Sequence, residues 1–113
     1  MAGMTVSNEP GYYHDGEFGI RIESVLVARK AATRHCFGAP SYLEFENLTW
    51  APLGLNMVEP SLLSDSERAW VDAYHAQCRE KLMPLLAGED ATNEMARAWL
   101  LKETVPLAEY FHR

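Results

Sequence analysis

The residues of this 113-residue chain that are best placed for chemistry are two glutamates, Glu9 and Glu23, which lie at equal distances from Gly16. The dipeptide Asp15-Gly16 is typical of a β-hairpin turn. If the hairpin is centred on Gly16, the two glutamates oppose each other on one face, with Cβ atoms roughly 4.5–5.5 Å apart. Such like charges repel, so a protein keeps the pair when water solvates it, when one carboxyl is protonated, or when a cation lies between them.

The neighbours of Glu23 leave three interpretations of this pair open. Glu23 lies just before the apolar run Val25–Val27, so we expect it to be shielded from solvent. Arg21 has the same strand parity and can neutralise one carboxylate. The pattern therefore allows a metal-binding or catalytic role, a structural ion pair with Arg21, or surface exposure. A slip of one residue at Pro10-Gly11 would instead move Glu9 to the opposite face.

The elements that must position these residues change character near residue 60. Alternating and β-branched residues predict strands at 4–9, 18–28 and 42–50, with a loop at 30–41 between the last two. The sequence Ser64-Asp65-Ser66-Glu67 has the form of a capping box and predicts the start of a helix. That helix is expected to bury one stripe, made of Leu63, Trp70, Tyr74, Cys78, Leu82 and Leu85. A second helix from about Thr92 is expected to direct inward the side chains of Met95, Trp99 and Leu100.

Composition excludes several classes of partner. Ten basic and sixteen acidic residues give a net charge of −6, which argues against nucleic acid or an anionic membrane surface. No run approaches the roughly 20 apolar residues that span a membrane. Cys36 and Cys78 form no metal-binding motif and allow one disulfide, but the favoured interpretation is two free thiols in a reducing, cytoplasmic compartment. Of the four histidines, His75 is expected to cap or pack in the first helix.

The hairpin residues also resemble a specific family. Ser7–Tyr13, Asp15-Gly16 and Phe18–Glu23 are similar in sequence and spacing to the end of the catalytic domain of the Xaa-Pro aminopeptidases, or aminopeptidases P, which are "pita-bread" metallopeptidases. The resemblance continues into the C-terminal extension of the longer members of that family, through Leu43–Thr49 with Pro52, Trp70 with Tyr74-His75, and Trp99-Leu100 with Glu103-Thr104 and Pro106. It covers nearly the whole chain.

The resemblance implies roles for four hairpin residues. In that family two metal ions, usually manganese, are bound by two Asp, one His and two Glu, and the reaction is hydrolysis of an N-terminal Xaa-Pro bond. Glu9 matches a ligand of one metal that also assists proton transfer, and Glu23 matches the ligand that bridges both metals. Tyr13 and Arg21 match positions that form hydrogen bonds around the metal site, which orient the ligands.

The resemblance also defines what to expect of the chain as a whole. The other three ligands lie upstream in the family, so we expect this chain to supply two of five metal ligands and to be inactive without the N-terminal part of the catalytic domain. Proline-containing peptides are the implied substrates, and a homodimer is the implied assembly. The alternative is a non-catalytic dimerisation module, whose Trp70/Tyr74 and Trp99 stripes would also contact a partner.

The predicted fold class is α+β. Residues 1–58 are expected to be antiparallel strands from the C-terminal part of a pita-bread sheet. Residues 59–113 are expected to form a helical C-terminal extension with two helices.

Overall fold

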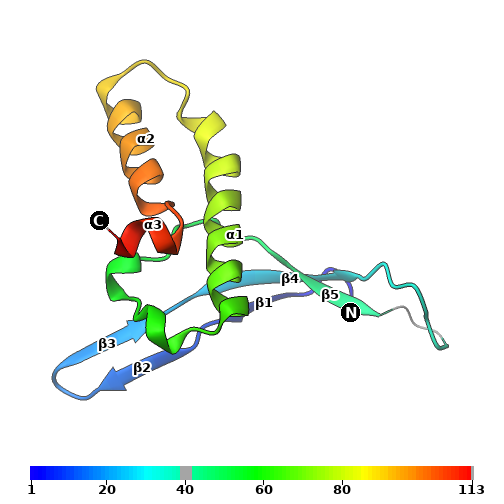
Figure 1. Cartoon of the computed structure of the whole chain (residues 1–113). Helices are drawn as coiled ribbons and strands as arrows, with labels where there is room; N and C mark the ends of the chain where they lie inside the picture. Colours follow the sequence, from blue (N-terminus) through cyan, green and yellow to red (C-terminus); the bar gives the residue numbers. More distant parts are fainter. Residues whose placement is uncertain (39–41, 113) are drawn as a thin grey trace. The chain divides into compact units, whose positions relative to one another are not determined.

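The computed structural model describes residues 1–38 and 42–112, and Figure 1 shows its strands and helices along the chain. The described residues form two compact units, 1–49 and 50–113, which are treated separately below. The first unit contains only antiparallel strands and the second only helices, so the predicted α+β class is confirmed. Residues 50–58, which the sequence grouped with the strands, lie in the helical unit.

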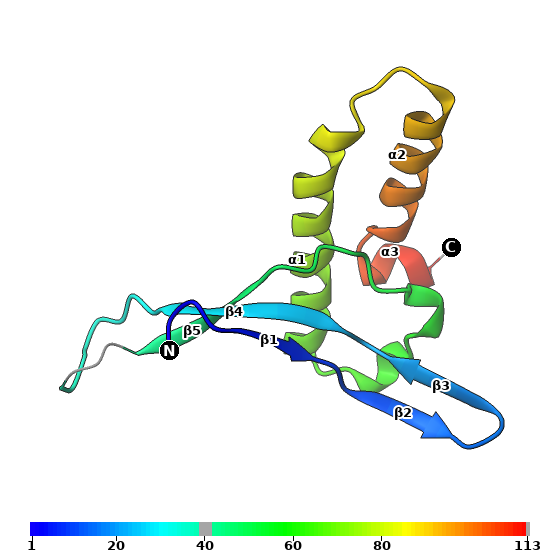
Figure 2. The ribbon, with the colours of Figure 1, turned by 180° about the vertical axis from the view of Figure 1, so that it is seen from behind.

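The strand unit is built from one long antiparallel hairpin and a third strand. Its strands are β1 (Thr5–Asn8), β2 (Gly11–His14), β3 (Phe18–Arg21), β4 (Ser24–Lys30) and β5 (Leu43–Asn47). β1, β4 and β5 form one sheet in the order β1-β4-β5, and β2 pairs with β3 (Figure 2). The expected loop before β5 includes residues 39–41, which lie outside the described residues.

The hairpin is centred on Gly16, as the sequence predicts. Asn8 pairs with Ser24 in one ladder and Gly11 pairs with Arg21 in the other, and both pairs are symmetric about Gly16. At the turn, the Glu17 amide donates to the His14 carbonyl at 3.1 Å. Gly16 has a φ of 77°, the positive value that a type II turn requires at its third residue. The two ladders therefore share one register.

The prediction of an unbroken strand over 18–28 is wrong, because the strand is interrupted between β3 and β4. The Ile22 amide donates to the Pro10 carbonyl at 3.1 Å. Proline has no amide hydrogen, so the return bond of that pair cannot form and the ladder is weakened there. Residues 12–14, which lie outside the predicted strands, contribute most of β2.

The helical unit contains two long helices and several short ones. These are the 3₁₀ turns η1 (Leu55–Met57), η2 (Pro60–Leu62) and η3 (Met83–Leu86), and the α-helices α1 (Asp65–Leu82), α2 (Ala91–Glu103) and α3 (Leu107–Phe111). The predicted capping box begins α1, since the Ser64 hydroxyl accepts from the Glu67 amide and the Glu67 carboxylate accepts from the Ser64 amide. Pro84 lies just after α1 ends, as its lack of an amide hydrogen favours.

The core of the helical unit joins the segment before α1 to the helices. It consists of Leu55, Val71, Val105 and Leu107, with Leu53, Val58, Leu63 and Tyr110 packed against it. Leu55 is fully buried. Residues 50–58 belong to this unit because they supply part of its core. None of the helices in the described ranges is long and apolar enough to cross a membrane.

Four residues predicted to lie inward in the helices are exposed instead. Trp70 and Trp99 keep 58% and 54% of their surface accessible, and Leu85 and Met95 are more exposed still. The buried face of α1 is made of Val71, Tyr74, His75 and Cys78. Trp70 lies beside that face and stacks on Tyr74, with ring centroids 5.4 Å apart. Helical spacing correctly predicted that Tyr74 and Cys78 on α1 and Leu100 on α2 are buried. It did not predict which neighbouring apolar residues are exposed.

Candidate metal site

The register places Glu9 directly opposite Glu23. One neighbouring pair is Asn8 with Ser24, and the other is Pro10 with Ile22, whose hydrogen bond is described above. Hydrogen-bonded and non-bonded pairs alternate along an antiparallel ladder, so the glutamates occupy a non-bonded pair, where the side chains are closest. The sequence prediction that Glu9 and Glu23 oppose each other on one face is therefore confirmed by the register.

Arg21 bridges the two carboxylates. Its guanidinium lies 3.6 Å from a Glu9 oxygen and 3.5 Å from a Glu23 oxygen. The positive charge of Arg21 is therefore shared by both carboxylates and reduces the repulsion between them. The expected shielding of Glu23 is wrong, because half of its side chain is accessible. It lies at the interruption between β3 and β4, where the adjacent Ile22 is also exposed.

Tyr13 lies flat over the same face of the hairpin. A Cβ atom added at Gly19 would come 2.8 Å from Tyr13 Cδ1, and one added at Gly11 would come 2.6 Å from the Tyr13 hydroxyl oxygen. The ring therefore occupies the space above both glycines. Gly19 is the direct cross-strand partner of Tyr13, and Gly11 is two residues before Tyr13 on β2. Since Gly11 pairs with Arg21, the hydroxyl lies beside the arginine that bridges the glutamates.

Gly19→Ala is expected to displace the Tyr13 ring, because the new methyl group would overlap it. We expect a cost of about 1 kcal/mol, at the low end for overpacking, since the exposed ring can swing outward. Nuclear Overhauser contacts between the Tyr13 ring and the Gly11 α-protons would be lost in the variant. Ser7→Ala, on the same face, is the control that should keep them. Unchanged contacts in Gly19→Ala would contradict this placement of Tyr13.

The donor chemistry of the pair fits divalent cations that prefer oxygen ligands, such as manganese. The carboxylates are opposed and partly accessible, and the Arg21 guanidinium contacts both of them. Within residues 1–38 and 42–112, however, no group of three or more His, Cys, Asp and Glu side chains could hold a metal ion. Among the described residues, Glu9 and Glu23 have the donor chemistry of metal ligands but do not by themselves make a complete site.

The histidines and cysteines play other parts. His14 lies 3.5 Å from Glu17 at the turn, and His75 is buried within the helical unit, as the packing expectation for His75 predicts. Both cysteines are free thiols, with Cys36 exposed and Cys78 buried. Burial raises the pKa of the Cys78 thiol, which keeps it protonated and unreactive.

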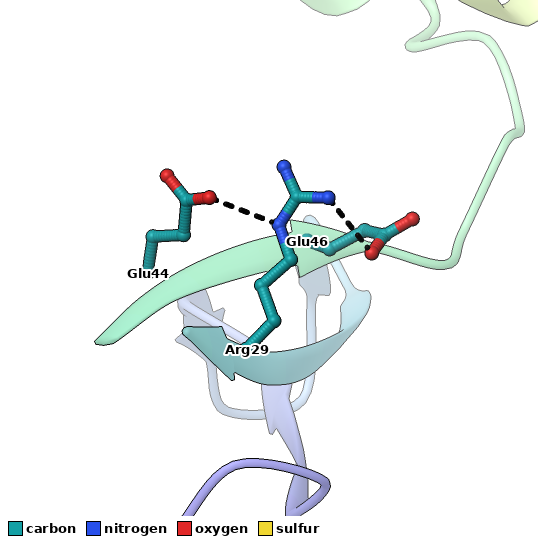
Figure 3. Close-up of polar contacts among 3 residues, drawn as sticks. All are labelled: Arg29, Glu44 and Glu46. Atoms are coloured by element: carbon teal, nitrogen blue, oxygen red, sulfur yellow. Dashed lines mark hydrogen bonds and ion pairs between the residues drawn. The ribbon is translucent and has the colours of Figure 1, made fainter. Parts of the chain in front are cut away.

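A second arginine between two glutamates was missed by the sequence reasoning. Arg29 on β4 lies 3.1 Å from Glu44 and 3.2 Å from Glu46, both on β5 (Figure 3). Glu44 is the direct cross-strand partner of Arg29, and Glu46 is the diagonal one. The alternation of Glu44 and Glu46 could have predicted that they share a face. These exposed ion pairs fit the observed register of β5 and contribute little to stability.

Comparison with known proteins assigns a family to this architecture. A family model described as the C-terminal region of peptidase M24 matches residues 41–107. The chain is 51% identical over 106 residues to "Probable Xaa-Pro aminopeptidase P" of Laccaria bicolor and 47% identical over 107 residues to that of Aspergillus fumigatus. The first match covers 94% of this chain and 16% of the relative. Since only seven residues of this chain fall outside that match, it includes Glu9 and Glu23.

A solved structure agrees with the sequence relatives. The structure of X-prolyl aminopeptidase from Caenorhabditis elegans is similar with a TM-score of 0.78 and 28% identity, over 94% of this chain and 17% of that chain. It is described as a cytosolic enzyme with a di-nuclear active site. The chain thus spans about one sixth of the length of the relatives it matches.

Proposed function

The chain belongs to the family of C-terminal regions of M24 peptidases, and from this membership we propose that it acts as that region of an aminopeptidase that releases the N-terminal residue before proline. The names of its relatives support this reaction and substrate class. The observation that supports the proposal is the register, in which Glu9 and Glu23 oppose each other on one face of the hairpin, as two oxygen ligands of one metal site would.

Four residues have distinct roles in this proposal. Glu9 would hold one metal ion and assist proton transfer, and Glu23 would be a ligand of both divalent ions, which we propose to be manganese. When bound, the ions supply Lewis-acid polarisation of the scissile carbonyl and activation of water. Arg21 and Tyr13 orient the carboxylates. Arg21 contacts both glutamates, and Tyr13 packs beside Arg21 over two glycines, which supports an orienting role for each.

The proposal gives the two parts of the chain different tasks. Residues 1–49 complete the catalytic domain and residues 50–113, which include the segment 50–58 packed in the helical core, form the helical extension, in a cytoplasmic homodimer. With two of five ligands, the chain is proposed to be inactive alone and to require the N-terminal part of the catalytic domain. Carboxylates at only two positions would also bind manganese weakly.

The activity of the chain in a complete enzyme tests this proposal. In a chimera, this chain replaces the matching stretch of the Laccaria bicolor relative, and hydrolysis of an Xaa-Pro-Yaa peptide is measured with added manganese. We expect the chimera to be active and chelator-sensitive, and the isolated chain to give no turnover above background. An isolated chain with robust, chelator-sensitive turnover would contradict the predicted inactivity. A folded but inactive chimera would contradict the proposed function.

The alternative function, a dimerisation module without catalysis, is favoured by one feature of the helical unit. An almost entirely apolar groove of about 290 Å³ lies between η3 and α2, lined by Leu82, Leu85, Leu86, Ala96, Trp99 and Leu100. Such a surface is typical of contact sites. Light scattering of the isolated chain distinguishes the two functions in part, since a discrete dimer supports the module and soluble aggregate supports an incomplete catalytic domain.

A further inference from the structure

Two adjacent residues of α1 hold the chain that precedes the helices. The Tyr74 hydroxyl donates to the Ala51 carbonyl at 2.8 Å. The Leu53 amide donates to Nε2 of His75 at 3.0 Å. Residues 51–53 are thus tied to α1 through side chains, directly before the fully buried Leu55. A change at His75 therefore acts on a segment that supplies part of the core.

This arrangement accepts only the neutral form of His75. Because Nε2 accepts a hydrogen bond, the ring proton must be on Nδ1. His75 keeps 1% of its surface accessible, and within the described part of the chain Nδ1 is buried without a hydrogen-bond partner. A second proton on Nε2 would point at the Leu53 N–H, remove that bond and bury a charge with no acceptor for either N–H.

The charged groups around His75 do not compensate for this cost. Burial lowers the pKa of His75 and is the largest effect; Asp72 opposes it, Arg79 reinforces it, and Glu103 opposes it. The Asp72 carboxylate accepts from the Leu107 amide at 2.8 Å, and Arg79 donates from Nε to the Thr104 hydroxyl at 3.0 Å. The Asp72 carboxylate and the Arg79 guanidinium therefore have hydrogen-bond partners other than His75. The pKa of His75 stays below its ordinary value, which keeps the ring neutral.

We propose that His75 is a pH-sensitive latch, which holds residues 51–53 on α1 while the imidazole is neutral and releases them when it is protonated. The pKa of His75 is lower in the folded unit than the value near 6.5 of an unfolded chain. The stabilisation from neutral His75 is thus complete above about pH 6.5. It is lost progressively as the pH falls below that value, because the released state binds the proton.

Hydrogen exchange of the Leu53 amide tests the latch in the intact chain. After correction for the intrinsic rate, we expect its protection to fall about tenfold between pH 6 and pH 5. The Ala28 amide, which donates to the Met4 carbonyl at 2.9 Å in the strand unit, is the internal reference and should keep its protection. Equal protection of Leu53 at pH 7.5 and pH 5 would overturn the proposal.

His75→Gln separates titration from packing. Its amide oxygen can accept from Leu53 but does not titrate, so Leu53 protection should become independent of pH. His112→Gln, which removes an exposed histidine of the same unit, should keep the wild-type pH dependence. A His75→Gln variant with the wild-type pH dependence would overturn the proposal. If that variant does not fold, the wild-type exchange profile and an NMR titration of His75 still decide, since a midpoint near 6.5 without loss of protection would exclude the latch.

Discussion

Glu23→Gln is expected to reduce kcat of the chimeric enzyme by about a thousandfold. The substitution keeps the shape of the side chain but removes the charge and one ligand oxygen of the proposed bridging position. Metal ions supply several kcal/mol of transition-state stabilisation, and each ~1.4 kcal/mol corresponds to a tenfold change in rate. Glu9→Gln should lose activity on the same scale, because Glu9 is also proposed to move a proton.

Glu17→Gln is the matched control for this experiment. Glu17 lies in the turn of the same hairpin, is exposed and contacts His14 rather than Arg21. Its removal should leave kcat within about threefold of the parent chimera. The structural ion-pair interpretation makes the opposite forecast for Glu23→Gln, a loss of stability below about 1 kcal/mol with activity retained. That result would remove Glu23 from the catalytic account.

Leu55→Ala is expected to cause the largest loss of stability, about 2–5 kcal/mol. Leu55 is fully buried among Val71, Val105 and Leu107, and its truncation leaves a cavity in a unit of only 64 residues. A unit of this size has little stability to lose, so the variant should be largely unfolded at 37 °C.

Tryptophan fluorescence in a urea titration measures this effect in the correct unit, because Trp50, Trp70 and Trp99 all lie in the helical unit. Leu62→Ala is the control. Leu62 is 81% exposed and lies in the same segment, so its truncation should change the free energy of unfolding by less than about 0.5 kcal/mol. Equal effects of the two substitutions would contradict the described core.

Several features of the fold follow from local sequence alone. The Asp15-Gly16 turn fixes the hairpin register, and the register in turn places Glu9 opposite Glu23 without any knowledge of the rest of the chain. The start of α1 follows from the Ser64–Glu67 capping box, and its end follows from Pro84. These signals act within a few residues, which is why the sequence was sufficient for them.

Other features depend on contacts between distant residues. Which apolar side chains of α1 are buried depends on what packs against the helix, so spacing alone did not distinguish Val71 from Trp70. The bond from Leu53 to His75 joins residues that are 22 positions apart. The exposure of Glu23 depends on what covers that face of the hairpin, since all residues of the neighbouring strands β2 and β3 are exposed too.

The most direct test of the central claim is to locate manganese in a crystal of the active chimera by anomalous scattering. We predict two manganese peaks beside the hairpin, with the Glu23 carboxylate contacting both ions and the Glu9 carboxylate contacting one. Arg21 and Tyr13 should lie around these carboxylates without touching the metal. Manganese bound at a distance from both glutamates, with Arg21 still bridging them, would show that the pair is a structural ion pair and contradict the account.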